Sequence, residues 1–348
     1  MSQSDVTRQG LRGKRPGRDA TTGVNLPRRW RGKHRAEQPM VPQAEFTSYY
    51  GKPILKPPVW RSPDIPGYLF LGGLAGGSSL LAAGADLTGR PVLSRIAKTG
   101  AATAGVVSVA ALVRDLGRPE RFLHMMRVFK ITSPMSVGSW LLGAYVPAAG
   151  VAALTALTGR LRWIGYGATA GAALLGPGVA SYTAALISDT AVPAWHEGYP
   201  EMPFVFTGSG MVAAGGLGMA ATALLAESGP GEGAPARYLA LLGGAMEAAA
   251  FEWMEHRVGM VAEPYSRGRG GRYVTAGKAL TVLGITGAAL GRRSRVATAL
   301  SGAAFVAASA ATRWGIYHAG MASARDPKYT VVPQRQRMNE RDAAIRHS

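Results

Sequence analysis

Long apolar runs are the feature of this sequence that most limits its fold. Each run holds about 20 residues with few or no charges, which is the length of helix that crosses the roughly 30 Å hydrocarbon core of a bilayer. A helix pairs its backbone polar groups within its own segment, so the runs predict an all-α integral membrane protein. The eight predicted transmembrane helices lie at about residues 64–85, 96–113, 136–157, 163–188, 203–226, 237–256, 273–291 and 296–318.

Strongly basic segments flank this predicted membrane domain of residues 64–318. Residues 1–63 hold 13 Lys or Arg against four acids and show no apolar period, which predicts a largely extended or disordered N-terminal arm. Residues 319–348 are predicted to form a polar, basic C-terminal tail. Much of the formal net charge of +19 therefore lies in tails and loops, where membrane lipid accounts for it and nucleic acid is not an expected partner.

The distribution of basic residues predicts the orientation of the chain. Eight spans place both termini on the same side of the membrane. Near the spans, that side carries 16 Lys or Arg, whereas the opposite side carries 9. Because cytoplasmic loops carry the excess of basic residues, both termini are predicted to be cytoplasmic.

A dense charged segment, residues 114–130, separates the second apolar run from the third. Gly117 and Pro119 interrupt any helix there. The segment is either a solvated loop whose arginines pair with neighbouring carboxylates, or a surface at the membrane edge that docks a partner and faces a cofactor. The two readings are compatible, since an ion-paired loop can also dock a partner.

Ionisable side chains within membrane spans are costly, and by default they indicate function. The sixth run carries Glu247, Glu252, Glu255 and His256, and the eighth carries Arg313. One interpretation is a proton path, as in an ion- or proton-translocating transporter, or a carboxylate close to a redox ligand. The other places Glu255 and His256 in the headgroup zone, leaves only Glu247 and Glu252 buried, and makes Arg313 a structural ion-pair partner.

The absence of cysteine restricts the cofactors that this chain can bind. It has no disulfide and cannot itself ligate a conventional iron–sulfur cluster. A b-type haem in a helix bundle needs two histidines at matching depth, and His256 and His318 both lie at the ends of their runs. A bis-histidine haem is therefore not expected here, and any electron comes from a bound cofactor, a substrate or a partner subunit.

Two neighbouring stretches carry a resemblance to a known family, Asp115–Phe122 (DLGRPERF) and Ser133–Trp140 (SPMSVGSW). Three shorter stretches agree with it: Gly73–Gly77 in the first run, Ser181–Ala184 in the fourth, and Ala191–Trp195 after it. Together with the eight-span layout, these motifs make about residues 60–320 similar to the NrfD/polysulfide-reductase membrane-subunit family.

The resemblance implies an architecture and a role. Such subunits form two four-helix bundles, here residues 64–188 and 203–318, and carry no haem or metal. They anchor a ferredoxin-like iron–sulfur subunit, usually beside a molybdopterin catalytic subunit. They pass electrons between that partner and menaquinone or ubiquinone held in the first bundle. The expected protein is thus a quinone-reactive subunit, not catalytic by itself, in the plasma membrane of a prokaryote.

The resemblance leaves several points of function open. The complex could be formate dehydrogenase-, sulfite dehydrogenase- or polysulfide reductase-like. The basic-residue count places the partner on the cytoplasmic side. The alternatives to the quinone-reactive role are a transporter and a structural anchor without a quinone site.

The resemblance also suggests residues for the quinone site. In a well-described relative, a His near the start of the first span and a Tyr in the fourth contact the quinone, and Tyr68 and Tyr182 stand at those positions here. Tyr68 departs from the family pattern, because a phenol with an ordinary pKa of ~10 is a poor proton shuttle. The other expected cofactor-binding residues are Asp115, Arg118 and Asp189, and the proton-handling candidates are Asp64, Asp115, His124, Glu247 and Glu252.

Overall fold

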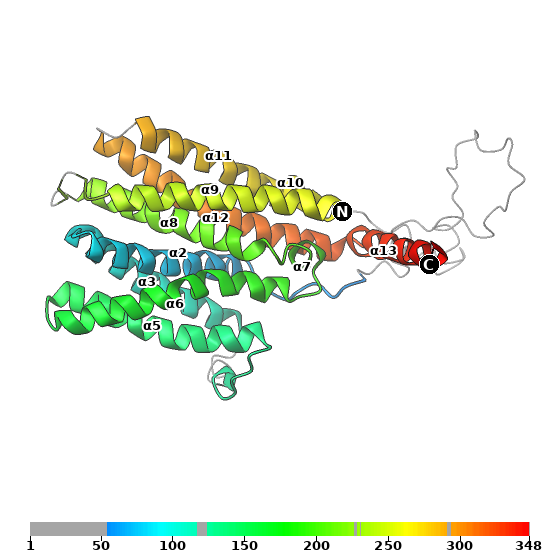
Figure 1. The fold of residues 1–348 in the computed structure, drawn as a ribbon, viewed down its shortest axis with the longest axis horizontal. Coiled ribbons are helices and arrows are strands. Elements are labelled where there is room, and N and C mark those ends of the chain that lie inside the picture. Colours follow the sequence, from blue (N-terminus) through cyan, green and yellow to red (C-terminus); the bar gives the residue numbers. More distant parts are fainter. Residues whose placement is uncertain (1–53, 117–123, 226–227, 230, 291–293, 348) are drawn as a thin grey trace, which may run out of the picture. The chain divides into compact units, whose positions relative to one another are not determined.

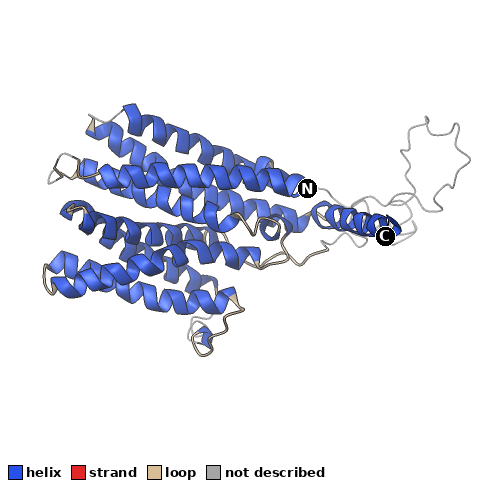
Figure 2. Cartoon of the chain, viewed as in Figure 1, coloured by secondary structure: helices blue, strands red, loops and turns tan. Residues whose placement is uncertain are grey.

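The computed structural model describes residues 54–347, apart from residues 117–123, 226–227, 230 and 291–293. The predicted N-terminal arm up to residue 53 and the centre of the charged segment lie outside the described residues. Within the described part of the chain, every residue is in a helix, turn or loop and none is in a strand (Figure 2). The prediction of an all-α protein is therefore confirmed.

A long helix lies at each of the eight apolar runs (Figure 1). These helices are α2 (Asp64–Leu87), α3 (Pro91–Asp115), α5 (Pro134–Thr158), α6 (Arg162–Ser188), α8 (Met202–Leu224), α9 (Ala234–Val258), α11 (Gly268–Leu290) and α12 (Arg295–Arg325). Five of them, α2, α3, α5, α6 and α8, are long and apolar enough to cross a membrane. For α9, α11 and α12, which are less apolar, membrane crossing stays a prediction.

The C-terminal region differs from the predicted division at residue 318. Helix α12 continues past that point to Arg325, and a further helix, α13 (Lys328–His347), follows it. The region expected as a polar tail is thus largely helical. By their contacts, residues 59–320 form one unit, whereas the other described residues, 54–58 and 321–347, belong to a second.

Local signals explain where α5 begins and ends. Ser133 precedes the helix in an extended conformation, and its side chain accepts a hydrogen bond from the backbone N–H of Ser136. Pro134 occupies the first helical turn, where backbone N–H groups have no partner within the helix, so the missing N–H of proline costs no hydrogen bond. Gly159 ends the helix in the left-handed region, with φ of 66°. The SPMSVGSW stretch is therefore the start of a capped helix.

Glycines allow α2 to approach two other helices closely. A Cβ atom at Gly76 would lie 2.3 Å from the carbonyl oxygen of Gly176 on α6. A Cβ atom at Gly77 would lie 2.5 Å from the carbonyl oxygen of Gly210 on α8. Small residues spaced four apart on a membrane helix allow such an approach. Helix α2 consequently packs against α3, α6 and α8 at once.

Replacement of Gly76 by valine tests this contact. We expect Gly76→Val to lower the free energy of unfolding by about 3 kcal/mol, because the opposing atoms are backbone and cannot move aside. Gly84→Val in the same helix is the matched control, since a Cβ there meets nothing within 4 Å, and a change within about 0.5 kcal/mol is expected. Unfolding in detergent measures both, and equal losses would contradict the prediction.

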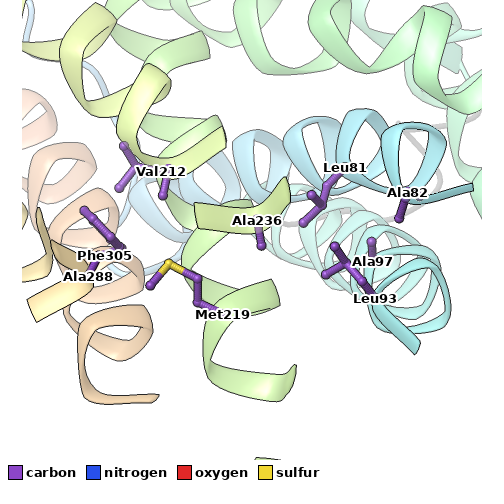
Figure 3. Packing of buried hydrophobic residues seen from close by; sticks show 11 residues of the cluster. Leu81, Ala82, Leu93, Ala97, Val212, Met219, Ala236, Ala288 and Phe305 are labelled. Atoms are coloured by element: carbon purple, nitrogen blue, oxygen red, sulfur yellow. The ribbon is translucent and has the colours of Figure 1, made fainter. Parts of the chain in front are cut away.

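A buried apolar cluster joins helices from both halves of the chain. It includes Leu81 of α2, Leu93 of α3, Met219 of α8 and Phe305 of α12, which pack around small alanine side chains (Figure 3). The alanines shorten the distance between helices, so contacts form without large side chains. The cluster fixes the end of the helices where α2 turns into α3.

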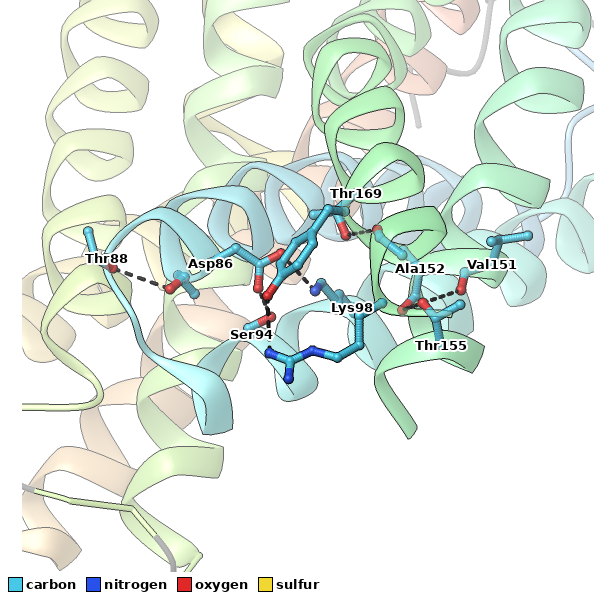
Figure 4. Close-up of polar contacts among 12 residues, drawn as sticks. Asp86, Thr88, Ser94, Lys98, Val151, Ala152, Thr155 and Thr169 are labelled. Carbon is cyan, nitrogen blue, oxygen red and sulfur yellow. Dashed lines mark hydrogen bonds and ion pairs between the residues drawn. The ribbon is translucent and has the colours of Figure 1, made fainter. Parts of the chain in front are cut away.

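A buried ion pair lies at the same end of α2. The ammonium nitrogen of Lys98 on α3 lies 2.7 Å from Oδ2 of Asp86 on α2 (Figure 4). The hydroxyl of Ser94 donates to the other carboxylate oxygen at 2.5 Å. Since both charges are largely withdrawn from solvent, removal of either one would leave the other unpaired. The pair therefore holds α2 and α3 together.

Candidate functional site

Three residues expected to bind the cofactor line one cavity. Tyr68 comes from α2, Asp115 from the end of α3 and Tyr182 from α6. The cavity has a volume of about 70 Å³, room for roughly five to seven water-sized spheres. The rest of its wall is mainly apolar and includes Trp60, Ile65, Leu69, Leu112, Met135, Leu142 and Ile187. Tyr68 and Tyr182 thus line the same cavity although they are 114 positions apart in sequence.

Among the described residues, the hydroxyl of Tyr182 has no hydrogen-bond partner. The oxygen is buried, and no donor or acceptor among the described residues reaches it. A buried hydroxyl without a partner costs about 1–3 kcal/mol. A ligand with a carbonyl or hydroxyl group in this cavity would relieve that cost.

Gly138 of α5 makes the space that the Tyr182 ring occupies. A Cβ atom at this position would lie 2.2 Å from Cε2 of Tyr182 and 2.6 Å from Cδ2. Even an alanine would therefore collide with the ring. The glycine of the SPMSVGSW stretch thus positions a tyrosine of another helix, a role that the sequence alone does not predict.

The side chain of Tyr68, on α2, is buried against neighbouring helices, and only 2% of its surface is exposed. Its backbone carbonyl accepts a hydrogen bond from the hydroxyl of Ser108 on α3 at 3.1 Å. This bond fixes the turn of α2 that carries the phenol. Tyr68 therefore reaches the cavity from a rigid helix pair.

Asp115 is half-buried at the edge of the cavity. One of its carboxylate oxygens accepts a hydrogen bond from the backbone N–H of Arg61 at 3.1 Å. Beside it, Asp64 lies 3.1 Å from the guanidinium of Arg114. Asp64 is thus engaged in an ion pair and does not line the cavity, whereas Asp115 does.

The remaining predicted site residues lie elsewhere. His124 and Asp189 are exposed and do not line the cavity. Arg118 lies outside the described residues. Their roles stay predictions. Trp60, Met135 and Ser139 also line the cavity. No sequence pattern predicted a site role for them, although Met135 and Ser139 belong to the SPMSVGSW stretch.

A cluster of aromatic rings supports the outer wall of the cavity. Trp195 lies in the short helix α7 (Pro193–His196), is fully buried, and stacks on Trp60 with 5.5 Å between ring centroids. Its indole N–H donates to the carbonyl of Ile316 at 2.8 Å. The hydroxyl of Tyr317 donates to the carbonyl of Trp60 at 2.8 Å. The segment before α2 is therefore tied to α12.

An ion pair fixes the connector that follows α7. The guanidinium of Arg257 lies 2.6 Å from a carboxylate oxygen of Glu201, and it also donates to the carbonyl of Glu197 at 2.5 Å. The hydrogen bonds from Arg257 hold the pKa of Glu201 below its ordinary value. The pair is therefore ionised at neutral pH and joins the start of α8 to the end of α9.

The ionisable residues of the sixth and eighth runs divide into buried and exposed groups. Glu247 is 8% exposed and Arg313 is fully buried. Glu252, however, is exposed, and it pairs with Lys278 at 2.7 Å. Glu252 is thus not covered by protein, because it projects from a different side of α9 than Glu247, and its depth in the membrane stays a prediction. Lys278 also lies 2.8 Å from Glu255.

Arg313 bonds to the backbone of α8. Its Nη2 atom donates to the carbonyl of Phe206 at 2.5 Å, and its guanidinium lies 3.7 Å above the Phe206 ring. The carboxyl of Glu247 faces this guanidinium and the hydroxyls of Ser209 and Thr312. No ion pair within 4.0 Å joins Arg313 to a carboxylate of the described residues. The structural partner of Arg313 is thus a backbone carbonyl.

Comparison with known proteins identifies the family. The family model described as polysulphide reductase, NrfD, matches residues 55–264, which is more than half of the chain. The chain belongs to the NrfD family. With five helices able to cross a membrane, it is a multi-pass membrane subunit of the kind found in oxidoreductase complexes. No protein with a curated function matches the chain.

The NrfD match includes the whole cavity wall. Tyr68, Asp115, Tyr182 and Trp60 all lie inside residues 55–264. The matched region ends before α11 and α12.

Proposed function

We propose that this NrfD-family chain is the quinone-reactive subunit of a respiratory oxidoreductase complex. It would pass electrons between the iron–sulfur cluster of a partner and menaquinone or ubiquinone. The observation that carries the proposal is the largely apolar cavity in which Tyr68, Asp115 and Tyr182 meet. The unpartnered hydroxyl of Tyr182 fits a quinone, which combines an apolar ring with two hydrogen-bonding oxygens.

The three polar residues have separate tasks in this proposal. When bound, a quinone accepts or releases two electrons together with two protons. Tyr182 would donate a hydrogen bond to one quinone oxygen and fix the ring. Tyr68, held by Ser108, would limit the depth to which the ring enters. Asp115 lies half-buried at the edge, where its carboxylate can exchange protons between the cavity and the solvent.

The proposed partners follow from the family and from the absence of cysteine. A ferredoxin-like iron–sulfur subunit would supply the cluster, and a molybdopterin subunit would act on the substrate. Both would sit at the end of the helices that carries Asp115. By the count of basic residues, this is the cytoplasmic side of a prokaryotic plasma membrane.

Tyr182→Phe tests the proposal in the assembled complex. Loss of one hydrogen bond of about 1 kcal/mol should raise the KM for quinone roughly fivefold. Stability should not fall, because the Tyr182 hydroxyl has no partner within the described protein. Steady-state reduction or oxidation of a soluble quinone analogue gives the KM, and thermal unfolding gives the stability.

Tyr145→Phe provides the matched control. The Tyr145 hydroxyl is buried and lies 2.7 Å from the hydroxyl of Ser79, away from the cavity. Its removal should lower stability by about 1 kcal/mol and leave the quinone KM unchanged. An unchanged KM in Tyr182→Phe would favour a structural anchor without a quinone site.

A further inference from the structure

A second cavity lies between α9, α11 and α12. Its volume is about 350 Å³, within the range of roughly 300–1,000 Å³ that is typical of small-molecule sites. Apolar side chains form most of its wall, including Leu241, Phe251, Val282 and Ile285. Nothing in the proposed function uses this cavity, and it shares no lining residue with the first.

Two buried polar residues, Glu247 and Thr312, line this largely apolar surface. Glu247 lines the cavity and is 8% exposed, and its Oε2 atom has no hydrogen-bond partner among the described residues. Thr312 lines the cavity beside it. A buried carboxyl oxygen left without a partner costs about 1–3 kcal/mol or more. A ligand that brings a hydrogen-bond donor to this position would remove that cost.

The cavity opens on the side of the helices. Val282, which lines it, is 63% exposed, and Ala248 and Glu252 are exposed as well. Lys278 at the rim is held by Glu252 and by a contact with the Phe251 ring at 5.0 Å. If α9 and α11 cross the membrane as expected, the opening faces lipid.

The depth of Glu247 limits the class of ligand. It lies 13 residues after Ala234 and 11 before Val258 at the ends of α9, so roughly 20 Å and 17 Å of helix separate it from those ends. This is near the middle of a hydrocarbon core roughly 30 Å thick. A phospholipid headgroup, about 15 Å away at the surface, cannot reach it. An acyl chain reaches it but brings no hydrogen-bond donor.

We propose that this cavity is a second binding site for the reduced, hydroquinone form of the membrane quinone. A quinol hydroxyl would donate to Glu247, the ring would lie against Phe251, and the isoprenoid tail would leave between α9 and α11. The site requires a ligand that reaches the bilayer interior, carries a hydrogen-bond donor and has an apolar body. A hydroquinone has all three properties. The inference rests on the proposed function only for the identity of the ligand.

Counting bound quinol tests the inference. The full complex is placed in lipid nanodiscs, decylubiquinol is added without oxygen, and bound molecules are counted by native mass spectrometry. Two quinols per chain are expected. Ala248→Trp should fill the mouth of the second cavity, so that one bound quinol per chain remains. Leu283→Trp is the matched control, because Leu283 is 60% exposed on α11 and does not line the cavity.

Two further variants examine the role of Glu247. Glu247→Leu removes the acceptor and should weaken binding of the second quinol about tenfold. Glu247→Gln keeps an acceptor oxygen and should change the affinity for the second quinol less than threefold. One quinol in the unmodified complex, or a phospholipid alone in the second cavity, would overturn the second site and leave the first intact. No bound quinol at all would overturn the proposed function as well.

Discussion

Gly138→Ala is expected to disable the proposed quinone site. The added Cβ would lie 2.2 Å from Cε2 of Tyr182, far inside van der Waals contact. The Tyr182 ring is rigid and held between α5 and α6, so the ring or a whole helix must move. We expect a stability loss of about 1–3 kcal/mol. Because the hydroxyl would leave its position, the KM for quinone should rise at least tenfold.

Gly150→Ala is the matched control for this substitution. It lies in the same helix, α5, and a Cβ there meets nothing within 4 Å. An alanine at that position should raise stability by up to about 1 kcal/mol, since glycine is a poor helix former. The quinone KM should stay unchanged.

A double substitution isolates the contact between the two helices. In a Tyr182→Ala background, Gly138→Ala should no longer reduce stability, because the ring that it strikes is gone. Thermal unfolding and quinone kinetics of the four proteins measure the coupling. Additive losses would show that Gly138 acts through something other than Tyr182.

Trp195→Ala is expected to have the largest effect on stability. Trp195 is fully buried, stacks on Trp60 and donates its N–H to the carbonyl of Ile316. Truncation of a buried tryptophan costs about 3–5 kcal/mol. Trp60 lines the first cavity, so the loss of its stacking partner should also raise the KM for quinone.

Two variants separate packing from hydrogen bonding at this position. Trp195→Phe keeps a ring but leaves the Ile316 carbonyl without its donor, so a smaller loss of about 1–3 kcal/mol is expected. Trp163→Ala is the control, because Trp163 is 75% exposed and should change the free energy of unfolding in detergent by less than about 0.5 kcal/mol. Similar losses for Trp195→Ala and Trp163→Ala would contradict the structural role.

The sequence predicted parts of the candidate site through its resemblance to the NrfD family. Tyr68 stands where a relative has a quinone-contacting His, and Asp115 belongs to the DLGRPERF stretch. Glu252 was described less well, because five residues along a helix turn a side chain by about 140° and so place it on another face than Glu247. Periodicity alone did not separate its exposed position from the buried one of Glu247.

What the sequence determined by itself is the all-α class and the position of the long helices. Length and apolar character are local properties, and a helix satisfies its backbone within one segment. The tertiary structure decided which groups meet: the space beside Gly138 belongs to Tyr182, and Trp195 bonds to a carbonyl 121 residues away. Such contacts depend on how helices are rotated and packed. That rotation is set by close contacts between distant residues, such as the glycines of α2, α6 and α8, and is not encoded in any single apolar run.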